Sequence, residues 1–203
     1  MAQSLLLYIA GIDMSAHMLV VRNDSRSERL ALISEYIGRL KKKLGRIDGY
    51  YGSSAWQSCL RDDEIMILVE FREDRRGDEA LRRFSKDKLA IDEAKLSAEP
   101  ADITVFDLQS RSGVRPGDAP LGSFLSLSRR TSAPGFGDDL QRELEAIFDS
   151  LTIIPGYLGH VQGSHPTLRD RVLGLALWAS EESFRSSLPV SAPFELKLFR
   201  KIL

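Results

Sequence analysis

The sequence contains one internal repeat, and this repeat limits the folds open to the chain more than any other feature. Residues 17–71 align without a gap with residues 124–178, at an offset of 107 positions. Nine of the 55 aligned pairs are identical: Arg22/Arg129, Ser25/Ser132, Leu44/Leu151, Ile47/Ile154, Gly49/Gly156, Tyr50/Tyr157, Gly52/Gly159, Asp63/Asp170 and Leu68/Leu175. A chain of 203 residues is about twice as long as a small α+β module. Duplication of one module is therefore the simplest explanation.

Both copies carry the same amphipathic helix pattern. Apolar side chains recur at spacings of four, three and four, with Ile33, Ile37, Leu40 and Leu44 aligned with Leu140, Leu144, Ile147 and Leu151. This spacing places the four side chains of each copy on one helix face. Each copy is therefore expected to bury the same helical stripe.

The order of elements within a copy follows from apolar alternation and turn residues. In the first copy, a helix is expected to begin at the capping box of Ser25 and Glu28, and a shorter one to run from Asp78 through Phe84. Strands are expected at 18–21, 49–57, 64–72 and 102–108. The second copy predicts helices over 138–151 and from Ser180 through Phe184, and strands at 124–130, 156–164, 171–178 and 194–202.

The expected order in each copy is therefore βαββαβ. The predicted modules span residues 1–109 and 123–203, and a Gly-, Pro- and Ser-rich linker at 110–122 joins them.

The predicted third strands are apolar on both faces. In the first copy Met66 and Leu68 alternate with Ile65, Ile67, Val69 and Phe71, and in the second Leu173, Leu175 and Leu177 alternate with Val172, Ala176 and Trp178. Helices can cover only one of these faces. The simplest solution is that the two sheets cover each other's second face and form a barrel within one chain.

The same alternation suggests a cavity in the second copy. On the face that carries Trp178, the preceding residues are Ala176 and Gly174, where the first copy has Val69 and Ile67. Small residues beside a large aromatic side chain leave room for a ligand. The alternative is that Gly174 accommodates a bulge or a bulky neighbour.

Charge and cysteine content exclude several classes of function. The chain has 28 Lys and Arg against 29 Asp and Glu, a formal net charge of -1, so no global field favours a nucleic acid partner. The lone Cys59 cannot form an internal disulfide and fits a reducing compartment. The apolar run at residues 5–10 is too short to span a membrane and lacks the basic residues of a signal peptide. We therefore expect a cytoplasmic protein.

Two short motifs accompany the duplicated βαββαβ order: Gly-Tyr-x-Gly at 49–52 and 156–159 in both copies, and Trp-Ala-Ser-Glu-Glu-Ser-Phe at 178–184 in the second copy. Together they resemble the antibiotic-biosynthesis monooxygenase (ABM) family of the dimeric α+β barrel superfamily. The resemblance implies an α+β fold of two ferredoxin-like βαββαβ modules, whose antiparallel sheets pack here as an intramolecular α+β barrel. Some members of this family are cofactor-independent monooxygenases that oxidise polycyclic phenols to quinones, and others bind and degrade haem.

The family's functional residues are matched only in part. Trp178 lies at the family's tryptophan, where the first copy has Phe71. Asn23 lies where haem-degrading members carry an asparagine, but Arg130 replaces it in the second copy. No histidine follows His165, although the haem ligand would be expected in the second helix. These departures weaken the haem hypothesis.

Four residues are candidates for a site: Trp178, Tyr157, Arg129 and His160. Arg129 could bind an anionic phenolate or carboxylate, or simply form a surface ion pair. Tyr157 could donate a hydrogen bond into a cavity or pack in the core. His160 could act as a base or be a turn residue. Strand parity places His160 opposite Tyr157, which predicts that the two side chains do not share a pocket.

The sequence thus predicts a monooxygenase-like protein that acts on a small aromatic or phenolic compound without a cofactor or metal. The alternative is a non-catalytic ligand-binding or assembly module, and haem binding or degradation is a third hypothesis. The expected assembly is a monomer with an internal barrel or a homodimer of such barrels.

Overall fold

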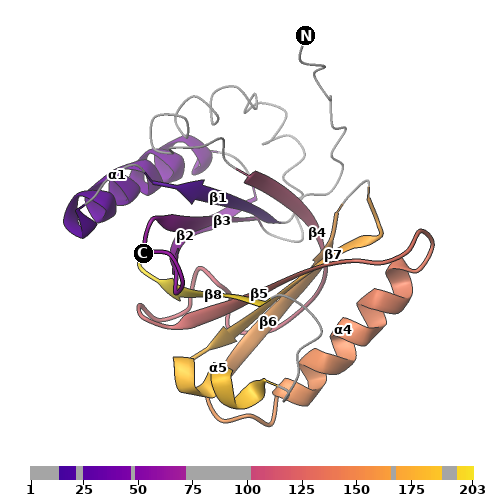
Figure 1. Cartoon of the computed structure of the whole chain (residues 1–203). Helices are drawn as coiled ribbons and strands as arrows, with labels where there is room; N and C mark the ends of the chain where they lie inside the picture. Colours follow the sequence, from indigo (N-terminus) through magenta and orange to yellow (C-terminus); the bar gives the residue numbers. More distant parts are fainter. Residues whose placement is uncertain (1–13, 22–24, 47–48, 72–101, 166–167, 189–195) are drawn as a thin grey trace.

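Eight strands close into an antiparallel barrel in the computed structural model, which describes residues 14–21, 25–46, 49–71, 102–165, 168–188 and 196–203 (Figure 1). The strands are β1 (Met14–Val20), β2 (Tyr50–Ser58), β3 (Glu64–Phe71), β4 (Asp102–Gly113), β5 (Phe124–Thr131), β6 (Tyr157–Ser164), β7 (Arg171–Trp178) and β8 (Leu196–Lys201). The helices of these residues are α1 (Arg26–Leu44), α4 (Gly137–Leu151) and α5 (Glu181–Ser187). The helix expected from Asp78 through Phe84 lies outside the described residues.

The barrel consists of two four-stranded modules with the same strand order. Module 1 is β1–β4 with α1, and module 2 is β5–β8 with α4 and α5. Their strands follow one another as β4-β1-β3-β2 and as β8-β5-β7-β6. Two seams join the modules, where β2 pairs with β8 and β4 pairs with β6. The prediction of an α+β barrel closed within one chain is confirmed.

Side-chain alternation divides the apolar residues between the barrel interior and the helices. The interior contains Met14, Ala16, Trp56, Met66, Leu68, Phe106, Ala119, Leu125, Leu127, Val161, Leu173, Leu175, Leu177 and Phe199. The outer face of module 1 packs against α1, and that of module 2 against α4 and α5, on the other side of the barrel (Figure 1). The expectation that β3 and β7 are apolar on both faces, with one face toward the helices and the other toward the second sheet, is confirmed.

The repeat is not gap-free, contrary to the sequence alignment. β2–β3 and β6–β7 do repeat at an offset of 107, including a bulge after Tyr50 and after Tyr157. In the first strands, however, Ser15 pairs with Val69 while Ser126 pairs with Ala176, which is an offset of 111. Helix α1 accounts for the difference, because it has 19 residues and α4 has 15. Four residues are close to one helical turn, so the apolar side chains of α1 stay on one face despite the four extra residues, and the sequence pattern does not reveal the insertion.

The helix caps and the strand ends differ in part from the expected ones. Ser25 is the N-cap of α1 but makes no side-chain capping bond, whereas Ser180 caps α5 by accepting from the Ser183 N–H at 3.1 Å. Strand β1 begins four residues earlier than expected, and β4 continues to Gly113 into the expected linker. The extra β4 residues pair with β6 across the seam.

A buried lysine and a buried glutamate hold the connection between the modules. The Lys201 ammonium donates to the carbonyl oxygens of Pro116, Gly117 and Ala119 at 3.1, 2.7 and 2.6 Å. The Glu70 carboxylate accepts from the Gly117 N–H at 2.6 Å. Since Lys201 lies on β8 and Glu70 on β3, this loop is bound to both modules.

The pH dependence of stability tests this arrangement through Glu70→Gln. Burial raises the pKa of Glu70 to about 7, although the Gly117 N–H favours the ionised form. The pKa of Glu70 in the folded state lies above its value in the unfolded state. The contribution of Glu70 to stability is therefore complete below about pH 4.5 and is lost as pH rises through about 7. Glu70→Gln should remove this loss. At about pH 8 the free energy of unfolding of the variant should therefore exceed that of the wild type by about 3 kcal/mol.

Urea unfolding of both proteins across this pH range measures the difference. Parallel stability profiles for the wild type and Glu70→Gln would show that Glu70 is not held with a raised pKa.

Candidate functional site

Hydrogen-bond register arranges the outer face of module 2 in rows across β5, β7 and β6. The rows are Phe124–Trp178–Tyr157, Ser126–Ala176–His160, Ser128–Gly174–Gln162 and Arg130–Val172–Ser164. The middle strand supplies two small residues, Gly174 and Ala176, and both flanking strands supply polar ones. This face is therefore a shallow trough with polar sides.

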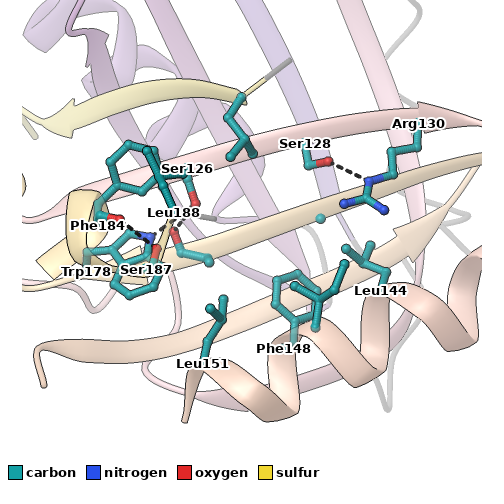
Figure 2. A pocket seen from close by; sticks show the side chains of 14 residues that line it. Ser126, Ser128, Arg130, Leu144, Phe148, Leu151, Trp178, Phe184, Ser187 and Leu188 are labelled. Atoms are coloured by element: carbon teal, nitrogen blue, oxygen red, sulfur yellow. Dashed lines mark hydrogen bonds between the residues drawn. The ribbon is translucent and has the colours of Figure 1, made fainter. Parts of the chain in front are cut away.

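A cavity of about 70 Å³ lies between this trough and the two helices (Figure 2). Its floor is formed from β5, β7 and β8, and its walls from α4 and α5. The lining residues are Ser126, Ser128, Arg130, Leu144, Ile147, Phe148, Leu151, Gly174, Ala176, Trp178, Phe184, Ser187, Leu188 and Leu196. Trp178 and Arg130 lie at its opposite ends (Figure 2).

Trp178 is fixed in place at the apolar end. Its side chain is buried, and its Nε1 donates to the Ser126 hydroxyl at 3.1 Å. The rings of Tyr157 and Phe184 contact it edge to face, with centroid distances of 5.4 and 6.1 Å. The indole is thus held rigidly with one surface on the cavity.

Arg130 provides the positive charge at the other end. Its Nε donates to the Ser128 hydroxyl at 3.2 Å and its guanidinium to the Glu143 carboxylate at 3.0 Å. The Arg130 side chain is only 10% exposed, whereas that of Glu143 is 62% exposed. A ligand anion in the cavity would therefore meet a largely desolvated guanidinium whose partner faces the solvent.

Arg129, the arginine chosen from the sequence, is placed elsewhere. It is 41% exposed and pairs with Asp102 at 2.6 Å. Neighbouring residues of a strand point to opposite faces, so Arg129 and Arg130 cannot both face α4. The structure does not bring Arg129 to Trp178.

A bulge overturns the parity argument for Tyr157 and His160. The register shifts between Tyr157 and Gly159, which puts Tyr157 and His160 on the same face of β6. Gly159 has φ +155°, and a Cβ there would lie 2.4 Å from the Ser112 carbonyl oxygen. The Tyr157 hydroxyl and His160 Nδ1 are 2.7 Å apart. The expectation that these two side chains point apart was therefore wrong.

Burial favours the neutral form of both partners. It raises the pKa of the Tyr157 hydroxyl, with a smaller contribution from Asp149. It lowers the pKa of His160, against the opposing effect of Asp149 and Glu145. A protonated hydroxyl and a neutral imidazole allow two directions for this bond: Tyr157 donates to Nδ1 when the histidine proton is on Nε2, and accepts from Nδ1 when the proton is there.

Phe148 lies between this pair and the cavity. Its ring stacks on His160 with a centroid distance of 4.3 Å and an angle of 4°. Of the four sequence candidates, only Trp178 lines the cavity, and Tyr157 and His160 lie behind Trp178 and Phe148. The polar alternation of Ser126, Ser128 and Arg130 was the signal that could have identified the lining of β5.

Module 1 has no comparable site on its described outer face. At the positions of Gly174, Ala176 and Gln162 it has Ile67, Val69 and Ala55, all buried against α1. In module 2, a Cβ on Gly174 would lie 2.9 Å from both Leu144 and Phe148. Gly174 therefore does both things considered from the sequence, since it lines a cavity and makes room for bulky neighbours.

Among the described residues, no group of three or more His, Cys, Asp or Glu side chains is placed to hold a metal ion. No described helix has the length and apolar character needed to cross a membrane.

No protein-family model and no curated protein matches the chain. Among solved structures it is similar to a "putative monooxygenase" from Fusobacterium nucleatum, with a TM-score of 0.68 and 10% identity over 95% of this chain and 94% of that one. A "putative monooxygenase" from Lactobacillus acidophilus gives a TM-score of 0.66 at 10% identity, over 95% and 94% of the two chains. An anthrone oxidase-like protein gives 0.64 at 12% identity, over 96% and 92%. These likenesses confirm the expected fold.

The Tyr157–His160 bond can be tested with Tyr157→Phe. In the wild type we expect nitrogen-15 NMR to show an unprotonated Nδ1 and a protonated Nε2 on His160 near neutral pH. Removing the hydroxyl should shift the Nδ1 resonance and lower the free energy of unfolding by about 1 kcal/mol.

The matched control is Tyr50→Phe in module 1, whose hydroxyl lies 2.7 Å from the Ser53 hydroxyl. This variant should leave the His160 resonances unchanged. A proton on Nδ1 in the wild type would contradict the assignment.

Proposed function

We propose that module 2 binds a small aromatic anion in the cavity between Trp178 and Arg130 and oxygenates it as a phenolate. The observation that carries the proposal is the charge distribution of the lining, in which Arg130 is the charged residue of a cavity otherwise walled by apolar and hydroxyl side chains. A guanidinium in such surroundings favours the ionised form of a phenol.

The chemistry requires no electron donor other than the substrate. A phenol with a free para position loses four electrons and two hydrogens, and O₂ contributes one oxygen atom to the quinone and the other to water. The residues of this chain would hold the phenolate oxygen at Arg130 and the ring against Trp178. The apolar walls from α4 would exclude water from the electron-rich ring.

Cavity size restricts the substrate. An engineered cavity of about 150 Å³ holds benzene, whereas this one measures about 70 Å³. A one-ring phenol therefore enters only when lining side chains rotate, and a polycyclic phenol requires a larger rearrangement. Haem would require a far larger rearrangement still, because the macrocycle exceeds this volume and Phe148 separates His160 from the cavity.

The similar structures support an oxygenase in general terms, since they are described as "putative monooxygenase" or anthrone oxidase-like. A fold alone does not determine an activity, so the site has to carry the argument.

The second candidate function is ligand binding without turnover. It is favoured by the shielding of Tyr157 and His160, which leaves no acid or base among the lining residues apart from Arg130. Binding by calorimetry without oxygen uptake would support this function and contradict the oxygenase.

We also propose that the barrel works as a monomer or as a homodimer of such barrels in a reducing compartment such as the cytoplasm. One chain already pairs both edges of each sheet, and Cys59 is a free, exposed thiol.

Two neighbouring arginines allow a matched test of anion binding. Arg130→Gln should weaken the binding of 4-nitrophenolate by roughly tenfold or more, because it removes a charge-assisted hydrogen bond in a desolvated site. Arg129→Gln removes the same charge from the opposite face of the strand and should leave the affinity unchanged. Equal losses in the two variants would point to a general charge effect and contradict the proposed site.

Oxygen uptake with a panel of phenols and hydroquinones tests the reaction itself. We expect uptake in the wild type and a loss of it in Trp178→Phe, a substitution that fits sterically because module 1 has Phe71 at this position. No uptake in the wild type would exclude the oxygenase, and equal uptake in Trp178→Phe would exclude a reaction that takes place against Trp178.

A further inference from the structure

We propose that the cavity extends beneath Leu144 and Phe148 to a polar subsite, formed by His160 and Gln162, that binds a hydroxyl group of the ligand. This inference rests on the proposed function, since it concerns the same ligand. It adds two specificity residues that do not line the cavity as it stands, and it limits the ligand to aromatic anions with a second, polar substituent.

The first argument is the continuity of the floor. Gly174 and Ala176 belong to the cavity, and their partners across β6 are Gln162 and His160. Paired strands lie about 4.8 Å apart, so the polar side of β6 begins one strand beyond the present wall. Neither Gly174 nor Ala176 has a side chain large enough to separate the two regions.

The second argument is that side chains, rather than backbone, form the wall. The atoms nearest to a Cβ built on Gly174 are the tips of Leu144 and Phe148. Phe148 lies flat on the His160 ring at 4.3 Å. A change of rotamer at these two residues would uncover His160 and Gln162 without moving α4. The space now filled by these two side-chain tips would then join the cavity.

The third argument is an unsatisfied acceptor in the covered region. Gln162 is 2% exposed, and its Nε2 donates to the Gln141 carbonyl at 2.8 Å. Its Oε1 is buried and has no hydrogen-bond partner. Such groups are rare in folded proteins because the lost hydration is not replaced. A ligand hydroxyl would supply the missing donor.

His160 completes a site that suits a hydroxyl group. In the tautomer in which Tyr157 donates to Nδ1, the imidazole carries its proton on Nε2. An acceptor at Gln162 and a donor at His160 match the donor and acceptor of one hydroxyl. With Arg130 as the anchor for the anion, the favoured ligands are hydroxylated aromatic carboxylates and dihydric phenols.

Two probes that differ only in the hydroxyl group test the subsite: 4-hydroxybenzoate and benzoate, with affinities measured by calorimetry. Phe148→Ala removes the cover. It should strengthen 4-hydroxybenzoate binding at least about fivefold more than benzoate binding. Phe148→Leu is a milder substitution that should act in the same direction if the alanine variant folds poorly.

Adding Gln162→Leu to either variant should abolish the preference for the hydroxyl group and retain benzoate binding. Ile37→Ala is the matched control, because Ile37 is buried between α1 and the module 1 sheet as Phe148 is buried between α4 and the module 2 sheet. This control should leave both affinities unchanged.

The outcomes separate the two proposals. Equal gains for both probes in the Phe148 variants, or a hydroxyl preference that survives Gln162→Leu, would overturn the subsite even if Arg130-dependent benzoate binding persists. Absence of binding of either probe to the wild type and to the Phe148 variants would overturn the subsite and the proposed function together.

Discussion

Backbone pairing across the two seams between the modules is the interaction on which the rest of the structure depends. A four-stranded sheet has two edges with unpaired N–H and C=O groups, which invite association with other chains. Here β2 pairs with β8 and β4 with β6, so each module satisfies the edges of the other. Because both modules are tethered in one chain, this pairing does not depend on protein concentration. The inner apolar faces are sealed as a result.

Sealing the interior allows the two outer faces to differ. The shared core fills the barrel, whereas each helix layer packs only on its own module. Module 1 has large aliphatic residues such as Ile67 and Val69 under α1. Module 2 has Gly174 and Ala176 at the same positions, flanked by polar side chains. The two copies therefore share one scaffold, and only the second has a candidate site on its described outer face.

The sequence predicted the features that depend on a simple period. Alternation along β3 and β7 separated interior from exterior side chains correctly, because each strand keeps its period of two along its length. The extra turn in α1 was hidden because four residues nearly complete a helical turn.

Features that depend on local irregularity or on tertiary packing could not be obtained in this way. The bulge before Gly159 reverses the parity of Tyr157 and His160, and parity is the property that the prediction used. Arg129 was preferred to Arg130 because the alignment offset was wrong by four residues in the first strand. The packing of α4 on the sheet produces the stacking of Phe148 on His160 and leaves the Gln162 oxygen without a partner. Residue spacing in the sequence does not predict this packing.

The position of β8 has a consequence for how the chain folds. In the barrel it lies between β2 and β5, although it follows both of them in the sequence. During synthesis, the strands of residues 14–178 must therefore leave a vacant place between two edges until residues 196–201 emerge. Any arrangement of β1–β7 that lacks β8 leaves the facing edges of β2 and β5 with unpaired N–H and C=O groups, with which another chain can pair.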